Sequence, residues 1–291
     1  MTKKLETSIW KLGHGRLIRL SGRSVIMGIL NVTPDSFSDG GEFDSLSSAL
    51  KHAEAMVGDG AEIVDIGGQS TRPGAETITA AQEQDRVLPI VEAICEAIDV
   101  AVSIDTYRAT TAKLSLDAGA HIINDVWGFQ KDPDIAAVAA ETGAGVCAMH
   151  TGRERTKLSD VLADQKLFLE QSITRLKAAG VPDEAIVLDP GFGFAKNPAE
   201  NIELLARFDE LKLLGYPLLC GTSRKRFVGH FTGQDEQNRD IGTAATSVVA
   251  RLKGASVFRV HDVSINRDAL NIADAVLEKQ NSTNGSIHVN L

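Results

Sequence analysis

Short apolar runs rich in β-branched residues recur along the chain, and each is followed by polar and glycine residues and then by an amphipathic stretch. The apolar runs are continuous and do not alternate with polar positions, which is typical of parallel strands buried on both faces. We expect eight such strands, at residues 25–31, 62–68, 101–106, 121–126, 145–150, 185–191, 216–222 and 257–262.

The stretches between these runs carry the spacing and the end signals of helices. In residues 45–57 apolar side chains recur at helical spacing, and a glycine follows the last of them. Thr79 with Gln82 has the form of a capping box, and Asn197 directly before Pro198 combines an N-cap residue with a proline at the first helical position. Further helices are predicted at residues 159–180, 241–253 and 263–279.

Eight consecutive strand-then-helix units predict a parallel sheet in an α/β protein. In a chain of 291 residues they fit a closed (β/α)8 TIM barrel in a single domain better than an open doubly wound sheet. We expect residues 1–20 to form an N-terminal extension whose hairpin covers the barrel floor. Residues 21–279 would form the barrel, and the polar residues 280–291 a disordered tail.

Composition narrows the class of protein further. The chain has 30 basic and 39 acidic residues, and the net charge of −9 argues against a nucleic-acid partner or an anionic membrane surface. No apolar run approaches the roughly 18 residues of a membrane span, and the first residues lack the apolar core of a secretory signal. The widely spaced Cys95, Cys147 and Cys220 offer neither a disulfide framework nor metal-ligand spacing. We therefore expect a cytoplasmic enzyme.

Polar side chains lie at the carboxyl ends of the predicted strands, and in a barrel these ends converge on one mouth, where active sites of this fold lie. A single carboxylate after a strand is most often a cap or turn residue. That explanation does not account well for polar residues at the ends of all eight strands. In strand order the residues are Asn31, Asp65, Asp105, Asn124 with Asp125, His150, Asp189, Ser223 with Lys225, and Arg259 with His261.

The residue types at this mouth predict the chemistry of a ligand. Three of them, Asp105, Asn124 and Asp189, supply acceptors in an enclosed site, and a ligand with several N–H donors on one edge would satisfy them. Three others, Lys225, Arg259 and His261, belong to the last two strands, where barrels commonly bind phosphate. We expect a donor-rich heterocycle on one side of the mouth and an anion on the other.

Two βα loops are long and rich in Gly, Pro, Ser and Asp. They are NVTPDSFSDGGEFDS at 31–45 and GGQSTRPGAETIT at 67–79. Loops of this kind at a barrel mouth are typical of lids that exclude water and position a substrate, although plain surface connections are the alternative.

Seven segments resemble the successive motifs of the dihydropteroate synthase family, in the order of that family and one at each strand end. They are MGILNVTPDSFSDGG (27–41), DIGGQSTRPGA (65–75), SIDT (103–106), IND (123–125), DPGFGF (189–194), GTSRK (221–225) and RVHDV (259–263). The resemblance implies a pterin-binding barrel that joins 6-hydroxymethyl-7,8-dihydropterin diphosphate to 4-aminobenzoate. The products would be 7,8-dihydropteroate and pyrophosphate, in a step of folate biosynthesis that sulfonamides target.

The resemblance also implies roles for individual residues. The pterin would be held by Asp105, Asn124, Asp189 and Lys225. The diphosphate would be contacted by Thr71, Arg72, Arg259 and His261, with Asn31 holding a Mg²⁺ bound to it. The 4-aminobenzoate slot would be formed by Phe37, Thr71, Pro73, Phe194 and Ser223, with the loop of Phe37 and Asp39 closing over it. The catalytic set would be Asn31, Asp39, Arg72, Lys225, Arg259 and His261 in a homodimer.

The mechanism that the resemblance implies is dissociative. The C–O bond would break first, the electron-rich pterin would stabilise the cation at its methylene, and the aniline nitrogen of 4-aminobenzoate would then attack. A metal and nearby cations would stabilise the departing pyrophosphate, and the loops would keep water from the cation. The absence of an obvious Ser/His or Cys/His nucleophile pair agrees with this mechanism.

Three places depart from the usual family pattern. Gln69 stands where Glu is usual, Ala195 stands where Gly is common, and residues 151–160 (TGRERTKLSD) differ from the usual sequence. Because this last segment follows His150, we assign no function to His150. Two alternatives remain. A methyltetrahydrofolate-dependent corrinoid methyltransferase should lack the NVTPDSF and RVH segments, and a non-catalytic pterin-binding relative would not require the whole set of strand-end residues.

Overall fold

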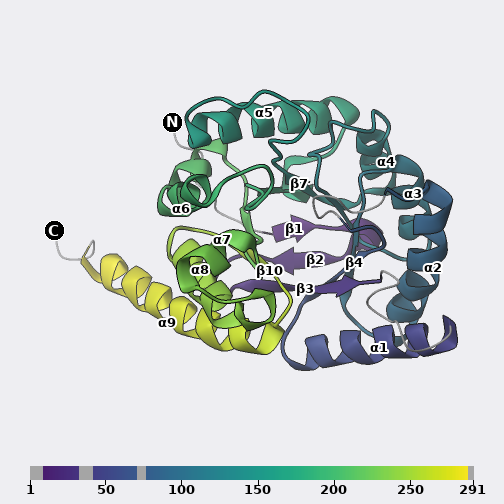
Figure 1. Cartoon of the computed structure of the whole chain (residues 1–291), viewed down its shortest axis with the longest axis horizontal. Coiled ribbons are helices and arrows are strands. Elements are labelled where there is room, and N and C mark those ends of the chain that lie inside the picture. Colours follow the sequence, from purple (N-terminus) through teal and green to yellow (C-terminus); the bar gives the residue numbers. More distant parts are fainter. Residues whose placement is uncertain (1–8, 33–41, 71–76, 288–291) are drawn as a thin grey trace.

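Eight parallel strands form a closed barrel with helices around it (Figure 1). The structure is a computed structural model that describes residues 9–32, 42–70 and 77–287. The barrel strands are β3 (Val25–Asn31), β4 (Ile63–Gly67), β5 (Ala101–Asp105), β6 (Ile122–Asp125), β7 (Gly145–Met149), β8 (Ile186–Asp189), β9 (Leu219–Cys220) and β10 (Val257–Val260). They pair in the order β8-β7-β6-β5-β4-β3-β10-β9, and a parallel bridge between Leu188 and Leu218 closes the ring. The predicted (β/α)8 fold is confirmed.

The helices alternate with the strands along the chain, as predicted. They are α1 (Glu42–Gly58), α2 (Ala80–Ala97), α3 (Ala109–Asp117), α4 (Ile135–Thr142), α5 (Val161–Ala179), α6 (Pro198–Ala206), α7 (Arg226–Thr232), α8 (Asp240–Leu252) and α9 (Val263–Ile287). Both predicted caps form: the Thr79 hydroxyl accepts from the backbone N–H of Gln82, and the Asn197 side chain accepts from that of Glu200. These side chains satisfy backbone donors that the first helical turn leaves unpaired.

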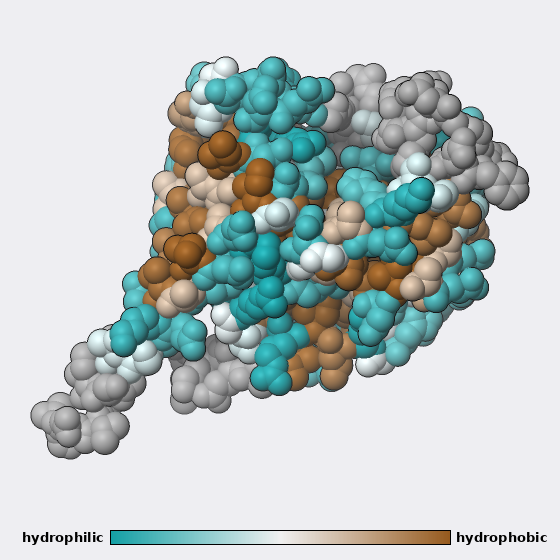
Figure 2. All heavy atoms as spheres, turned by 90° about the horizontal axis from the view of Figure 1, so that it is seen from below, coloured by the Kyte–Doolittle hydropathy of each residue, from teal (hydrophilic) through white to brown (hydrophobic). Residues whose placement is uncertain are grey.

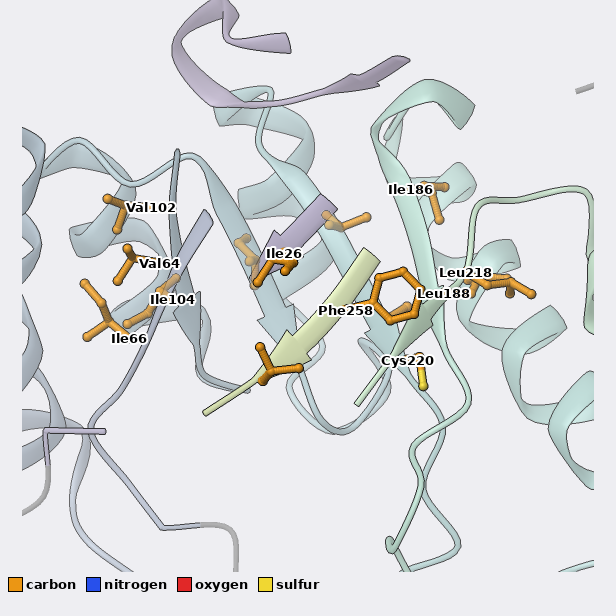
Figure 3. Close-up of a cluster of buried hydrophobic side chains, with 14 of the residues drawn as sticks. Ile26, Val64, Ile66, Val102, Ile104, Ile186, Leu188, Leu218, Cys220 and Phe258 are labelled. Atoms are coloured by element: carbon orange, nitrogen blue, oxygen red, sulfur yellow. The ribbon is translucent and has the colours of Figure 1, made fainter. Parts of the chain in front are cut away.

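The core has two parts, which explains why the strand sequences are apolar throughout. One set of side chains, including Ile26, Val64, Val102 and Phe258, belongs to the large cluster that packs between the strands and the helices (Figure 3). The alternate residues of the same strands, such as Val25 and Met27, belong to a second cluster. Because successive side chains of a strand point to opposite faces, both faces of each strand are buried.

A short hairpin covers the floor of the barrel. β1 (Ile9–Lys11) pairs antiparallel with β2 (Leu17–Arg19), so that Trp10 lies opposite Ile18. Trp10 is almost fully buried, and its indole Nε1 donates to the carbonyl of Ala185 at 2.8 Å. Its cluster includes a residue near the start of every barrel strand: Val25, Ile63, Ala101, Ile122, Cys147, Val187, Leu219 and Val257. The predicted hairpin is confirmed, and it leaves the opposite end of the barrel for a ligand.

The last helix is longer than predicted. We expected it to end at residue 279, whereas α9 continues to Ile287 and projects away from the barrel (Figure 1). The polar composition suggested an irregular tail, but the hydroxyls of Ser282 and Thr283 donate to the carbonyl of Lys279 and fit within the helix. Among the described residues no helix is long and apolar enough to cross a membrane.

We expect Trp10→Phe to lower the free energy of unfolding by about 1–3 kcal/mol, because the buried carbonyl of Ala185 loses its donor. Urea unfolding measures the change. Leu17→Ala, on the same hairpin at a side chain that is 58% exposed, is the control and should be nearly neutral. Equal effects of the two substitutions would contradict the role of Trp10 at the floor.

Candidate active site

A largely buried arginine links the ends of three strands at the open end of the barrel. Arg259 of β10 donates through Nε to Asp65 of β4 at 2.6 Å and through Nη2 to Asp105 of β5 at 2.9 Å. The amide nitrogen of Asn124 on β6 lies 3.2 and 3.3 Å from the two carboxylate oxygens of Asp65. Because this nitrogen is the donor, the carbonyl oxygen of Asn124 is left to accept from a ligand.

Burial and charge work against each other in this group. Burial raises the pKa of Asp105 to about 7, although the guanidinium of Arg259 opposes the rise. Burial lowers the pKa of Arg259, but the carboxylates of Asp65 and Asp105 raise it more, so the net pKa lies above its usual range. Arg259 therefore stays charged, while Asp105 is a desolvated carboxyl that a ligand with N–H donors would stabilise.

Asp189 of β8 supplies a further acceptor at the barrel mouth. It ends β8 and is buried, and its Oδ1 accepts from the backbone N–H of Gly191 at 2.7 Å. Burial raises its pKa, whereas that N–H and the ammonium of Lys225 lower it. A Cβ atom at Gly221 would lie 3.6 Å from the other oxygen, so this glycine leaves space beside the carboxylate. Asp189 thus has one oxygen held by the backbone and one beside open space.

Lys225 lies between the acceptors and an aromatic ring. Its ammonium is 4.3 Å from the centre of the Phe194 ring, close enough for a cation–π contact. Burial and the charge of Arg259 lower the pKa of Lys225 to about 8, so it remains mostly protonated at neutral pH. Phe194 is 7% exposed. The ring and the ammonium thus offer one apolar and one hydrogen-bonding surface at the same place.

Ser223 holds the ring of His261. The Ser223 hydroxyl accepts from the backbone N–H of His261 at 3.0 Å and lies 2.9 Å from the ring Nδ1. In the tautomer with the ring proton on Nε2, the hydroxyl donates to Nδ1 and Nε2 is a donor toward the site. Burial lowers the pKa of His261 to about 3, so the ring is a neutral donor at pH 7.

Asn31 ends β3 and is exposed at the mouth. A Cβ atom at Gly67 would lie 3.6 Å from the carboxamide oxygen of Asn31 and 3.8 Å from a carboxylate oxygen of Asp105. The glycine of β4 thus allows both side chains to lie over it. Asn31, Asp105, Asn124, Asp189, Phe194, Ser223, Lys225, Arg259 and His261 are the predicted site residues that the structure describes.

The remaining predicted site residues are Phe37, Asp39, Thr71, Arg72 and Pro73, and they lie outside the described residues. The departure at Gln69, just before the second of these segments, has a structural explanation. The side-chain oxygen of Gln69 accepts from Arg108 at 2.8 Å, and the same guanidinium nitrogen lies 2.8 Å from Glu83. The buried carboxylate of Glu83 therefore supplies the negative charge that Gln69 lacks.

Two strand-end residues gain a clear role only from the structure. Asp65 was noted as a strand-end carboxylate but not chosen as a site residue, and its contacts now place it at the centre of the site. Arg259 was expected with the other cations on an anion-binding side, whereas it points at carboxylates. Sequence position marked both residues, but only the pairing of the last strand, β10, with the first, β3, brings Arg259 close to the ends of β4 and β5.

The chain matches the model of the family described as "Pterin binding enzyme" over residues 27–261. With the acceptor-lined mouth, this defines the chain as a pterin-binding (β/α)8 enzyme. It is 46% identical over 258 residues to the dihydropteroate synthase of Clostridium beijerinckii, which covers 88% of this chain and 96% of that protein.

Solved structures agree. The dihydropteroate synthase from Clostridium difficile, in the presence of pteroic acid, aligns with a TM-score of 0.85 and 45% identity, covering 87% of this chain and 97% of that one. The Xanthomonas albilineans enzyme with 4-aminobenzoic acid has a TM-score of 0.88 at 37% identity and covers 93% and 98%. The Yersinia pestis enzyme in a sulfonamide drug complex has a TM-score of 0.84 at 43% identity and covers 92% and 98%.

The chain belongs to the dihydropteroate synthase family. It is a transferase with dihydropteroate synthase activity and acts in folate biosynthesis. This assignment decides against the corrinoid methyltransferase and the non-catalytic relative.

We expect Arg259→Met to lower the free energy of unfolding by about 3–5 kcal/mol at pH 8, because Asp65 and Asp105 lose their shared cation. The loss should shrink at pH 5.5. A carboxyl whose pKa is raised by folding favours the fold when protonated, and that contribution is lost as the pH rises through the folded pKa.

Urea unfolding at the two pH values measures this difference. Arg224→Met, which breaks a partly exposed pair with Asp240, is the matched control and should cost the same at both. A loss for Arg259→Met that does not depend on pH would contradict the assignment.

Proposed function

We propose that the strand-end residues described above carry out the condensation of 6-hydroxymethyl-7,8-dihydropterin diphosphate with 4-aminobenzoate. The observation that carries this proposal is the group of desolvated acceptors beside two largely buried cations at one barrel mouth. Related structures support it, because the Clostridium difficile enzyme was solved in the presence of pteroic acid and the Xanthomonas albilineans enzyme with 4-aminobenzoic acid.

The pterin binds at the acceptors. Its aminopyrimidinone edge presents N–H donors, which match the carboxylates of Asp105 and Asp189 and the carbonyl oxygen of Asn124. The Lys225 ammonium donates to an oxygen or nitrogen acceptor of the ring. Binding of the donors offsets the desolvation that raises the pKa of the two carboxyls, so the ligand completes hydrogen bonds that the empty pocket lacks.

The diphosphate lies toward Asn31 and His261. The neutral His261 donates from Nε2, Arg259 and Arg72 add positive charge, and the Thr71 hydroxyl contacts a diphosphate oxygen. The exposed carboxamide oxygen of Asn31 is a ligand type that Mg²⁺ accepts, and a magnesium ion carried by a diphosphate needs few protein ligands. When bound, the ion would supply positive charge that stabilises the departing pyrophosphate.

The second substrate packs against Phe194 and Ser223, with Phe37, Thr71 and Pro73 completing the slot and Asp39 in the loop above it. The C–O bond of the pterin diphosphate breaks first, and the pterin stabilises the positive charge at its methylene. The aniline nitrogen then forms the new C–N bond and loses its proton. No side chain forms a covalent bond with substrate in this scheme, and sulfonamides would compete for the same slot.

We expect pyrophosphate release by the purified chain to require 4-aminobenzoate and Mg²⁺. The kcat/KM for the pterin diphosphate should fall as the pH rises through about 8, because the free enzyme loses the Lys225 proton there and with it a charged donor. Lys225→Arg keeps the charge and should remove this fall. Lys225→Met should lower kcat/KM about 100-fold at pH 7. Pyrophosphate release that 4-aminobenzoate does not accelerate, or an unchanged pH profile in Lys225→Arg, would contradict the proposal.

We also propose that the chain acts as a homodimer in the cytoplasm. Large apolar side chains are exposed at one helical face of α8, including Ile241 and Val249, and at one face of α9, including Ile272 and Val276. The two helices pack side by side, and Figure 2 displays apolar side chains gathered beside the projecting α9. A second copy of the chain would cover this surface. The free thiols of Cys95, Cys147 and Cys220 suit a reducing compartment.

We expect the double substitution Ile241→Glu and Ile272→Glu to convert a dimer into a monomer in sedimentation experiments, because two charges would be buried in the interface. Ile241 is 79% and Ile272 70% exposed in the single chain, so folding should be unaffected. Leu213→Glu, at a side chain that is 77% exposed on another surface, is the control and should leave the dimer intact. A monomeric wild-type chain would contradict the proposal.

A further inference from the structure

A cluster of charged side chains surrounds His150 behind the proposed site. His150 follows β7 and is fully buried. Its Nε2 lies 2.9 Å from a carboxylate oxygen of Asp164 on α5 and 2.7 Å from a guanidinium nitrogen of Arg155, which also pairs with Asp164. Its Nδ1 lies 2.9 Å from the ammonium nitrogen of Lys196. Both ring nitrogens are therefore engaged, and His150 connects Lys196 to the Arg155–Asp164 pair.

Lys196 holds the loop that joins β8 to α6. Its ammonium donates to the carbonyl of Gly191 at 2.8 Å and contacts that of Phe194 at 3.4 Å. This loop, residues 190–197, begins directly after Asp189 and contains Phe194. Both residues belong to the proposed substrate site, but Asp189 is held in β8 by its pairing with β7, so Lys196 fixes the backbone on which Phe194 depends.

The loop needs such support because Ala195 holds an unfavourable left-handed conformation. Gly191, Gly193 and Ala195 all have positive φ, at 64°, 79° and 52°. For an alanine the left-handed region is unfavourable, so Ala195 is held in a conformation that glycine would adopt more easily. A Cβ atom at Gly191 would lie only 2.0 Å from the carbonyl oxygen of His150, so the loop presses against the end of β7.

The segment that departs from the family pattern supplies the other contacts. Lys157 donates to the carbonyl of Ala195 at 2.7 Å and pairs with Glu200 at the same distance. The guanidinium of Arg153 lies 4.6 Å from the centre of the Phe194 ring, and the ammonium of Lys225 also contacts this ring. With Arg155 in the cluster of His150, three basic side chains of this segment act on one loop. The departures at 151–160 and at Ala195 are thus in direct contact.

We propose that Lys196 is a positioning residue for 4-aminobenzoate binding: it holds the 190–197 loop so that Phe194 faces the slot, and His150, Arg155 and Asp164 hold Lys196. This inference rests on the proposed function, which places Phe194 in the 4-aminobenzoate slot. It also gives His150 a role through Lys196, although His150 does not touch substrate.

The position of the ring proton on His150 reports whether Lys196 is bonded to His150. Burial lowers the pKa of His150 to about 3, so its ring is neutral at pH 7. Burial lowers the pKa of Lys196 to about 7. A charged Lys196 donates to Nδ1 of His150, so the ring proton is on Nε2 and faces Asp164. A neutral Lys196 accepts from Nδ1–H instead, and Nε2 then accepts from Arg155. The other charged groups that act on Lys196 are Asp189, Asp164, Lys157, Arg155 and Glu200.

We expect Lys196→Met to raise KM for 4-aminobenzoate about tenfold, as the loss of hydrogen bonds from a charged donor implies. The dissociation constant of the pterin diphosphate should change less than about threefold, because Asp105 and Asn124 are held by other strands. Steady-state kinetics and calorimetry measure the two quantities. Lys196→Arg keeps the donors and should restore part of the affinity. Asp164→Asn, which loosens His150 and leaves Lys196 in place, should raise KM about threefold.

Two controls separate positioning from general loss of stability. Trp10→Phe lowers stability from the barrel floor and should leave KM unchanged, and Lys166→Met removes a partly exposed ion pair between α5 and Glu210 and should also leave it unchanged. In ¹⁵N-histidine spectra the His150 tautomer should change with a midpoint near pH 7 in the wild type, and Lys196→Met should abolish that change.

A wild-type KM in folded Lys196→Met, or a His150 tautomer that ignores this substitution, would overturn the inference. If the wild type itself released no pyrophosphate with 4-aminobenzoate, the proposed function would fail instead, so the two failures are distinguishable.

Discussion

The site depends on one largely buried guanidinium that must satisfy two carboxylates at once. Arg259 of β10 reaches Asp65 and Asp105 past β3, and it can do so because the last strand of the barrel pairs with the first. An unpaired carboxylate at this depth would be costly, so the ion pairs constrain where the ends of β4, β5 and β10 lie. Asn124 then takes its orientation from Asp65. The acceptors that face a ligand are in this way fixed before any ligand arrives.

This preorganisation has a cost in the ligand-free chain, which is visible in the raised pKa of Asp105 and the lowered pKa of Lys225. Both groups are desolvated without being fully paired. A pterin supplies donors to the first and an acceptor to the second, so binding relieves the desolvation that folding imposes. The floor of the barrel is different, because Trp10 and its apolar neighbours close it.

The local features were predictable from the sequence, and the contacts across the ring were not. Continuous apolar runs marked all eight strands, and the caps at Thr79 and Asn197 form as predicted, because these signals depend on neighbouring residues. Strand-end positions also marked Asp65 and Arg259, but their pairing depends on strands about 190 residues apart along the chain. The length of α9 was missed because polar composition does not exclude a helix. The support of the 190–197 loop by Lys196 was missed because Lys196 is held through His150, to which no function was given since the segment after it departs from the family pattern.

The most direct test of the account is a crystal structure of the chain with 6-hydroxymethyl-7,8-dihydropterin diphosphate and Mg²⁺. The account predicts that the aminopyrimidinone edge lies within hydrogen-bond distance, about 3 Å, of Asp105, Asn124 and Asp189, with the Lys225 ammonium on a ring acceptor. The diphosphate should extend toward Asn31 and His261. A pterin bound elsewhere, or one that leaves these three acceptors without a donor, would contradict the central claim that they form the pterin site.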